Sequence, residues 1–130
     1  MTGTTHDIGS KIANELASCD VKLIASLPDN WLMDIIDTVK QDDRFIHIPV
    51  NREESAVGLC SGAYMGAMGS AALMGASGFM TVIYAITKIN YTYEIPLFLM
   101  LTLSEAIWEL AFPSCGDPVP EIVPVQVEAL

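Results

Sequence analysis

Two adjacent carboxylates, Glu53 and Glu54, directly follow a short apolar run, residues 45–50, that favours a β-strand. The next residues have helical character, and acidic side chains in a first helical turn are ordinarily explained by the helix dipole. Asn51 is placed to be the N-cap, and Glu54, three residues later, completes the spacing of a capping box. Glu53 has no such local role, so it is the candidate for chemistry.

The helix that begins at these carboxylates carries glycine at every fourth position, at Gly58, Gly62 and Gly66. Residues at this spacing share one helix face. Each interior glycine costs about 0.5–1 kcal/mol of helix stability relative to alanine. We therefore expect another backbone to pack closely against this face, which would leave Glu53 partly buried.

Strand-like and helix-like segments alternate along the chain. The apolar runs that favour strands are residues 21–27, 45–50, 70–74 and 96–103. Helices are favoured at residues 7–20, after a turn at 28–30 capped by Asp29 or Asn30, after Asn51, and at 81–90. This pattern predicts an α/β fold, an open parallel sheet with helices on both faces.

Ligands of such sheets bind beyond the carboxyl ends of the strands. Five residues at these ends are predicted to bind a ligand: Pro28, Asp29, Glu53, Ser77 and Gly78. His47 lies inside the second strand, and no metal ligand or catalytic partner accompanies it in the sequence. It is therefore predicted to be a half-buried strand histidine.

Glu53, Ala56 and Gly62 fit the pattern Glu-x-x-Ala-x-x-x-x-x-Gly, and the segment resembles the pyrimidine-binding domain of thiamine-diphosphate enzymes. Residues 48–64 and 89–97 resemble more narrowly the alpha subunit of sulfopyruvate and phosphonopyruvate decarboxylases. The resemblance implies the three-layer sandwich of that domain, thiamine diphosphate as cofactor and a small 2-keto acid as substrate. It makes Glu53 the catalytic residue, hydrogen-bonded to N1′ of the aminopyrimidine, and burial at a subunit interface would favour its protonated form.

The chain has no Gly-Asp-Gly run with a downstream asparagine, which in the resembled family holds magnesium and the diphosphate. The resemblance therefore implies a beta subunit that carries the diphosphate-binding domain and most of the Mg2+ contacts. An α2β2 or larger hetero-oligomer would result. No metal site is predicted in this chain itself.

Two departures from the family pattern leave alternatives open. Residues 77–81 read Ser-Gly-Phe-Met-Thr where the family typically has Ser-Gly-Leu-Gly-Asn, so a noncatalytic or regulatory subunit, or a carboligase with the same cofactor, also fits. Residues 102–105 read Thr-Leu-Ser-Glu in place of a Ser-His-Arg-Gly segment. This loss of cationic groups favours a keto acid less anionic and more apolar than sulfopyruvate or phosphonopyruvate.

Composition limits the remaining possibilities. The net charge of −10 argues against nucleic acid or an anionic membrane as partner, and three distant cysteines fit a reducing cytoplasm. The uncharged run from Ser55 to Thr87 is long enough for a membrane helix, but its glycines and serines fit a buried helix, strand and helix better. We predict one domain over residues 1–112 and a proline-rich acidic tail over 113–130.

Overall fold

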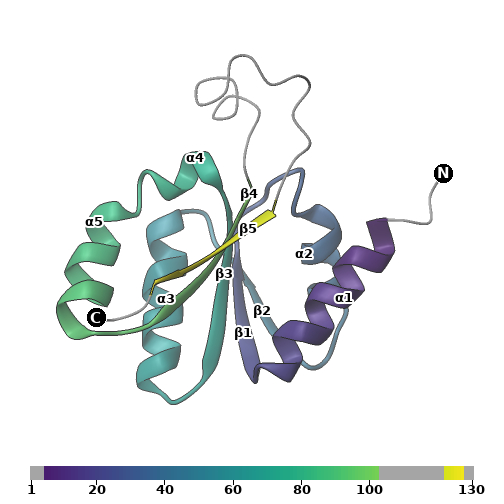
Figure 1. Cartoon of the computed structure of the whole chain (residues 1–130), viewed down its shortest axis with the longest axis horizontal. Coiled ribbons are helices and arrows are strands. Elements are labelled where there is room, and N and C mark those ends of the chain that lie inside the picture. The colour runs from purple at the N-terminus through teal and green to yellow at the C-terminus, as the bar shows by residue number, and fades with distance from the viewer. Residues whose placement is uncertain (1–4, 103–121, 128–130) are drawn as a thin grey trace.

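The computed structural model of the chain describes residues 5–102 and 122–127. Its strands are β1 (Val21–Ser26), β2 (Ile46–Pro49), β3 (Gly69–Gly75), β4 (Leu97–Thr102) and β5 (Ile122–Val127). Its helices are α1 (Thr5–Ser18), α2 (Met33–Lys40), α3 (Glu53–Met65), α4 (Ala76–Phe79), α5 (Ile83–Ala85) and the π-helical η1 (Ile86–Tyr91). They form three layers, with the sheet between two layers of helices (Figure 1).

The strands form one sheet in the order β2-β1-β3-β4-β5, in which the first four are parallel. β1 lies between β2 and β3, so that Ile24 is opposite both His47 and Ala71. The inner strands are buried on both faces, which is why their sequences are apolar at nearly every position. The predicted α/β class with a parallel sheet covered on both faces is confirmed.

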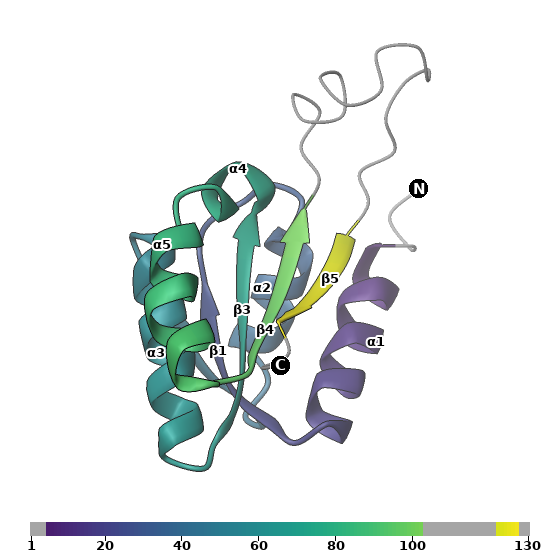
Figure 2. The ribbon, with the colours of Figure 1, turned by 60° about the vertical axis from the view of Figure 1, so that its left-hand side comes forward.

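Each face of the sheet has its own apolar core. Side chains alternate along a strand, so neighbouring residues of β1 and β3 belong to different cores. The core under α1 and α2 includes Ile24, Leu32, Ile35, Val39 and Leu73. The core under α3 and the helices after β3 includes Ala25, Val57, Cys60, Met74 and Leu99. Figure 2 shows the two helix layers on opposite sides of the sheet.

The fifth strand was not predicted, because it lies in the segment expected to be a tail. β5 runs antiparallel to β4, with Leu97 opposite Val127 and Thr102 opposite Ile122. Pro124 has no N–H to donate, and an edge strand tolerates this because only one of its sides is paired. Six residues of the expected tail therefore belong to the sheet. The predicted boundary between residues 112 and 113 lies outside the described residues.

The start of α3 differs from the prediction. Its N-cap is Arg52, which has an extended backbone (φ −145°, ψ 142°), and no side chain caps the helix. Because Arg52 is extended, Asn51 lies one residue too early to reach the amides of the first turn. The predicted capping box between Asn51 and Glu54 is wrong.

The helix predicted at residues 81–90 is divided into α5 and η1. Asn90, in the π-helical segment, is buried, and its Nδ2 donates to Ser61 Oγ (3.0 Å) and to the Ile95 carbonyl (3.1 Å). These bonds tie η1 to α3 and to the segment that leads into β4. The π-helical turn thus coincides with a buried polar anchor.

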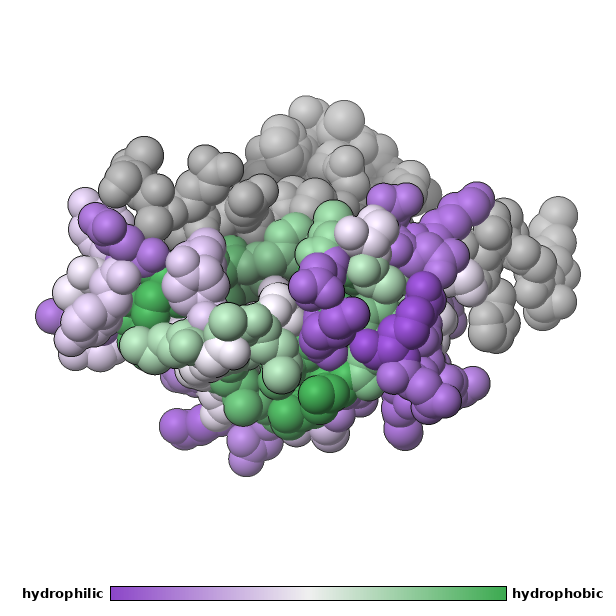
Figure 3. All heavy atoms as spheres, turned by 90° about the horizontal axis from the view of Figure 1, so that it is seen from below, coloured by the Kyte–Doolittle hydropathy of each residue, from purple (hydrophilic) through white to green (hydrophobic). Residues whose placement is uncertain are grey.

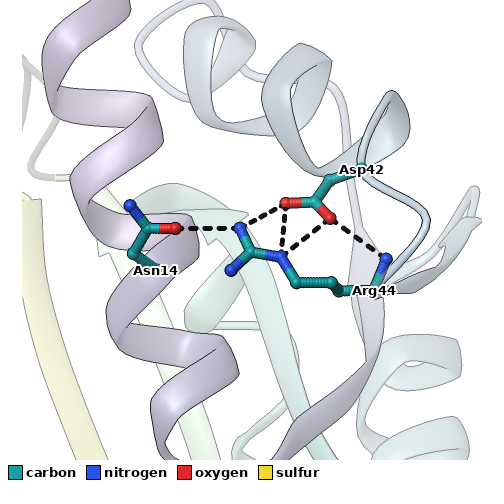
Figure 4. Close-up of polar contacts among 3 residues, drawn as sticks. All are labelled: Asn14, Asp42 and Arg44. Carbon is teal, nitrogen blue, oxygen red and sulfur yellow. Dashed lines mark hydrogen bonds and ion pairs between the residues drawn. The ribbon is translucent and has the colours of Figure 1, made fainter.

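The turn before β2 is fixed by Arg44 (Figure 4). Its Nε donates to Asp42 Oδ1 (2.9 Å), and its Nη2 donates to Asn14 Oδ1 of α1 (2.9 Å). The hydrogen bond from Arg44 holds the pKa of Asp42 below its ordinary value. The guanidinium also lies 5.6 Å from the centroid of the Phe45 ring. The turn is thereby linked to both α1 and the core.

The uncharged run from Ser55 to Thr87 is shared among α3, β3, α4 and the helices that follow. The predicted succession of helix, strand and helix is present, but only β3 is largely buried, whereas α3 is buried on one side and α5 has no buried residue. Within residues 5–102 and 122–127, no helix is both long enough and apolar enough to cross a membrane.

An apolar groove of about 590 Å3 lies beside α1 where the strands begin. Its walls include Leu16, Val21, Leu97, Phe98 and Met100. Figure 3 views this end of the molecule and shows apolar surface bordered by hydrophilic residues. The groove lies at the opposite edge of the sheet from the predicted site.

Candidate functional site

The predicted site residues come together at the carboxyl edge of the parallel strands. Pro28 and Asp29 follow β1, Glu53 begins α3 just after β2, and Ser77 and Gly78 lie in α4 just after β3. Because β1 is flanked by β2 and β3, the three connections are neighbours in space. Figure 1 shows α4 at this end of the sheet.

Glu53 packs directly against Gly78. A Cβ at position 78 would lie 2.7 Å from both Cγ and Cδ of Glu53, and closer still to its Oε1. Such a distance is not possible between real carbon atoms, so any other residue at position 78 would displace Glu53. Glycine here permits a close approach of backbone and carboxyl group. Glu53 is half-buried, as the sequence predicted.

Asp29 makes a similar contact with Gly75, the last residue of β3. A Cβ at position 75 would lie 2.7 Å from Asp29 Oδ2 and 3.8 Å from Ser77 Oγ. The site therefore contains two carboxylates, each against a glycine. Asp29 and Ser77 were predicted from their positions after strands, whereas Gly75 was not singled out.

The turn after β1 does not cap α2 as predicted. The N-cap is Leu32, and it makes no side-chain capping bond. Asp29 instead closes its own turn, because its Oδ1 accepts from Trp31 N (3.0 Å) and its carbonyl accepts from Leu32 N (3.0 Å). One oxygen of the Asp29 carboxylate is thus fixed, and the other faces Gly75.

Thr102 is a further residue of this edge. It ends β4 opposite Gly75, it is buried, and its Oγ1 has no hydrogen-bond partner among the described residues. The sequence placed Thr102 at a strand end but assigned it no ligand contact. A threonine that ends an otherwise apolar strand is the signal that could have identified it. Residues 103–105 lie outside the described residues.

The glycine face of α3 is open. No described atom lies within 4 Å of a Cβ at Gly58 or at Gly62. Met65, three residues after Gly62, is 74% exposed, and α5 of the same layer exposes Ile83 and Tyr84. The close packing predicted for this face is therefore not made within the described chain.

The two described cysteines differ in exposure, and the described residues form no metal-binding cluster. Across the described ranges, no group of three or more His, Cys, Asp or Glu side chains could hold a metal ion. Cys19 is exposed at the end of α1, whereas Cys60 of α3 is buried in the core between this helix and the sheet. Burial raises the pKa of the Cys60 thiol to about 11, so Cys60 is a core residue. Cys115 lies outside the described residues.

No protein-family model matches the chain. It is 35% identical over 91 residues to sulfopyruvate decarboxylase subunit alpha of Methanocaldococcus jannaschii. The aligned region covers 70% of this chain and 54% of that relative. It is 35% identical over 82 residues to the subunit of the same name from Methanococcus maripaludis, covering 63% and 49%. It is 29% identical over 87 residues to sulfopyruvate decarboxylase of Methanosarcina acetivorans, covering 67% and 22%.

The matched region spans about half the length of the first two of these relatives. On this chain it covers about two thirds of the residues. The predicted resemblance is thereby confirmed, and the chain is a homologue of the alpha subunit of sulfopyruvate decarboxylase.

Proposed function

We propose that the chain is the alpha, pyrimidine-binding subunit of a split thiamine-diphosphate-dependent 2-keto acid decarboxylase. The observation that carries this proposal is the contact of Glu53 with Gly78 at the carboxyl edge of the sheet. Asp29 and Ser77 lie on the neighbouring connections. The similarity to sulfopyruvate decarboxylase alpha subunits supports the reaction class.

The residues at this edge fit the aminopyrimidine end of the cofactor. Glu53 and Asp29 lie against the backbone at Gly78 and Gly75, so that two hydrogen-bonding carboxylates border this edge of the sheet. Glu53 and Asp29 would hold the ring, and Pro28, Ser77 and Gly78 would border it. When bound, thiamine diphosphate supplies the nucleophilic carbon and the electron sink for decarboxylation.

Glu53 is the residue of this chain that would take part in the reaction. Its carboxyl group would hold the proton of a hydrogen bond to ring nitrogen N1′. Its contact with Gly78 places the group against the backbone of α4 and limits its movement in that direction. Asp29, held by the amide of Trp31, would orient ligands at the same edge.

We assign the diphosphate and Mg2+ contacts to a beta subunit, because the sequence has no Gly-Asp-Gly run. Two relatives bear the name subunit alpha, which implies a second subunit in those proteins. The open face of Gly58 and Gly62 begins five residues after Glu53 and is suited to close contact with another chain. A hetero-oligomer of α2β2 or larger type would complete the site.

For the substrate we propose a 2-keto acid less anionic than sulfopyruvate. The support is the sequence of residues 102–105, Thr-Leu-Ser-Glu, which offers no cation and adds an acid. Sulfopyruvate, phosphonopyruvate and neutral-tailed keto acids would be compared on the reconstituted complex. A higher specificity constant for the sulfonate or phosphonate would overturn this part of the proposal.

The proposal is tested by mixing the chain with a candidate beta subunit, thiamine diphosphate and Mg2+, and by measuring release of carbon dioxide. The chain alone is expected to bind the cofactor weakly, because most contacts lie on the partner. Assembly without decarboxylation would favour the alternative of a noncatalytic subunit. That alternative is supported by the altered segment Phe79–Thr81, in which Met80 is exposed where the family typically has a second glycine.

A further inference from the structure

A separate cavity of about 430 Å3 lies between α2 and the outer strand β2. It is on the α1 and α2 side of the sheet, whereas Glu53 begins the helix that covers the other side. Its apolar walls are Pro28, Met33, Ile36, Phe45 and Pro49. Its charged or titratable lining residues are Asp37, Lys40 and His47. The cavity therefore combines an apolar body with a small polar end.

His47 forms part of the polar end. It is half-buried, as the sequence predicted, and its Nε2 shares a 2.7 Å hydrogen bond with the Oγ of buried Ser26. This bond fixes the plane of the imidazole ring. No partner for Nδ1 is found in the described part of the chain, so that nitrogen is available to a ligand.

Lys40, in the last turn of α2, provides a second cationic group. Its ammonium group makes no hydrogen bond or ion pair with any residue that the structure describes. Burial, and then the charge of Lys40, lower the pKa of His47. The two groups are thus close enough to repel one another when both are charged. At pH 7 the imidazole is therefore mostly neutral, and an anion here could pair with the Lys40 ammonium group and accept a hydrogen bond from the neutral His47 ring.

Asp37 limits the charge that such an anion can carry. It lies three residues before Lys40 on the same helix, is exposed, and also lines the cavity. While His47 is neutral, Lys40 and Asp37 leave the lining with no net charge, so a monocarboxylate adds one negative charge to the cavity and a dianion adds two. The apolar walls suit a short hydrocarbon body.

We propose that this cavity binds a small monocarboxylate with a short hydrocarbon chain. Its carboxylate lies between Lys40 and Nδ1 of His47, and its hydrocarbon lies against Met33, Ile36 and Phe45. The site is independent of the thiamine site proposed above, although Pro28 borders both. Phe45 is held in place for this contact by the Arg44 guanidinium over its ring.

The experiment uses the full chain and sodium butyrate as the probe, followed by the NMR resonances of the His47 ring and of α2 amides at pH 7. We expect binding with a dissociation constant on the order of millimolar, as suits so small a ligand. Butyramide has nearly the same shape without the charge, and inorganic phosphate has charge without the hydrocarbon. Both are expected to bind at least about tenfold more weakly.

Lys40→Gln and His47→Gln are each expected to weaken butyrate binding about five- to tenfold. Lys22→Gln is the matched control, because Lys22 is paired with Asp20 (3.2 Å) near the other edge of the sheet. If His47→Gln does not fold, the exposed Lys40 still tests the site. The proposal is overturned if butyramide binds as well as butyrate, or if the Lys22 and Lys40 variants weaken binding equally. Tighter binding of phosphate would overturn the choice of a monocarboxylate.

Discussion

The side chain of Glu53 occupies the space that a Cβ at Gly78 would need. The two residues are 25 positions apart in the sequence and come from different connections of the sheet. The contact makes position 78 a determinant of where the Glu53 carboxyl group lies. It also gives the site a test that does not alter any ionisable group.

Gly78→Ala is expected to lower decarboxylation by the reconstituted complex at least about tenfold, because the new methyl group would displace Glu53 from its position. Activity with a partner subunit and the circular dichroism of the chain would be measured together. Gly66→Ala is the control, since a Cβ there meets only the end of its own helix, at 3.4 Å, and binding of the partner is measured for both variants because Gly66 lies on the glycine face of α3. Equal activity of the Gly78→Ala complex and the wild type would show that the contact with Gly78 does not determine the position of Glu53 that activity requires.

Glu53→Gln is expected to reduce turnover by a factor of about 100 or more while the complex still assembles, because it preserves size and removes the exchangeable proton. Glu54→Gln is the matched control, being an exposed neighbour in the same helical turn. Turnover and sedimentation of the complex would be measured for both variants. If both variants retained near-normal turnover, Glu53 would be only a first-turn acid.

Gly58→Ala is expected to stabilise the isolated chain by about 0.5–1 kcal/mol, since the residue is within α3 and its face is open. The same change should weaken binding of the partner subunit if that subunit packs on this face. Urea unfolding measures the first effect, and titration calorimetry with the partner measures the second. A variant that is more stable yet binds the partner normally would remove this face from the interface.

The thiols are expected to differ in reactivity. At pH 8, iodoacetamide should modify Cys19 rapidly, because Cys19 is exposed. Cys60 should react only after unfolding, because it is buried and its pKa is raised to about 11. Mass spectrometry of peptides from native and urea-treated protein would measure both. Rapid native modification of Cys60 would indicate that α3 opens readily from the sheet.

The stability of the chain should decrease as the pH falls through about 6.5, the ordinary pKa of histidine. The pKa of His47 is lowered in the folded protein, so the unfolded chain binds this proton first. The loss continues until the pH is below the folded pKa and then levels off. Urea unfolding at pH 7.5 and 5.5 should show a smaller decrease for His47→Gln than for the wild type. The comparison cancels the contribution of His6, which both proteins contain.

The strands β1, β3 and β4 were predictable because an inner parallel strand is buried on both faces and reads as a continuous apolar run. The strand β5 was not, because prolines in its region argue against regular structure. Its pairing with the free edge of β4 overrides that local preference. The predicted N-caps of α2 and α3 were wrong for a local reason. Backbone conformation at Arg52 and Leu32 decides the cap, and side-chain type does not reveal it.

The location of the candidate site could be predicted from the sequence, but the contacts between its side chains could not. The alternation of strands and helices predicts parallel strands, so the carboxyl ends that carry Asp29, Glu53 and Ser77 are expected at one edge of the sheet. The contact of Glu53 with Gly78 depends on how α4 folds back after β3, which no spacing in the sequence records. The π-helical turn at Asn90 was missed in the same way, since a pattern of period 3.6 does not distinguish it.

The direction of β5 determines which surface the described residues leave uncovered. A parallel fifth strand would require its connection to travel from the carboxyl edge of the sheet back to the amino edge, usually as a helix lying across one face. An antiparallel strand begins at the edge where β4 ends, so its connection need not make that crossing. The groove beside α1 lies on the path that such a crossover helix would follow on one of the two faces. The antiparallel direction of one strand, β5, thus accounts for the apolar surface at the groove beside α1, to which several elements contribute (Figure 3).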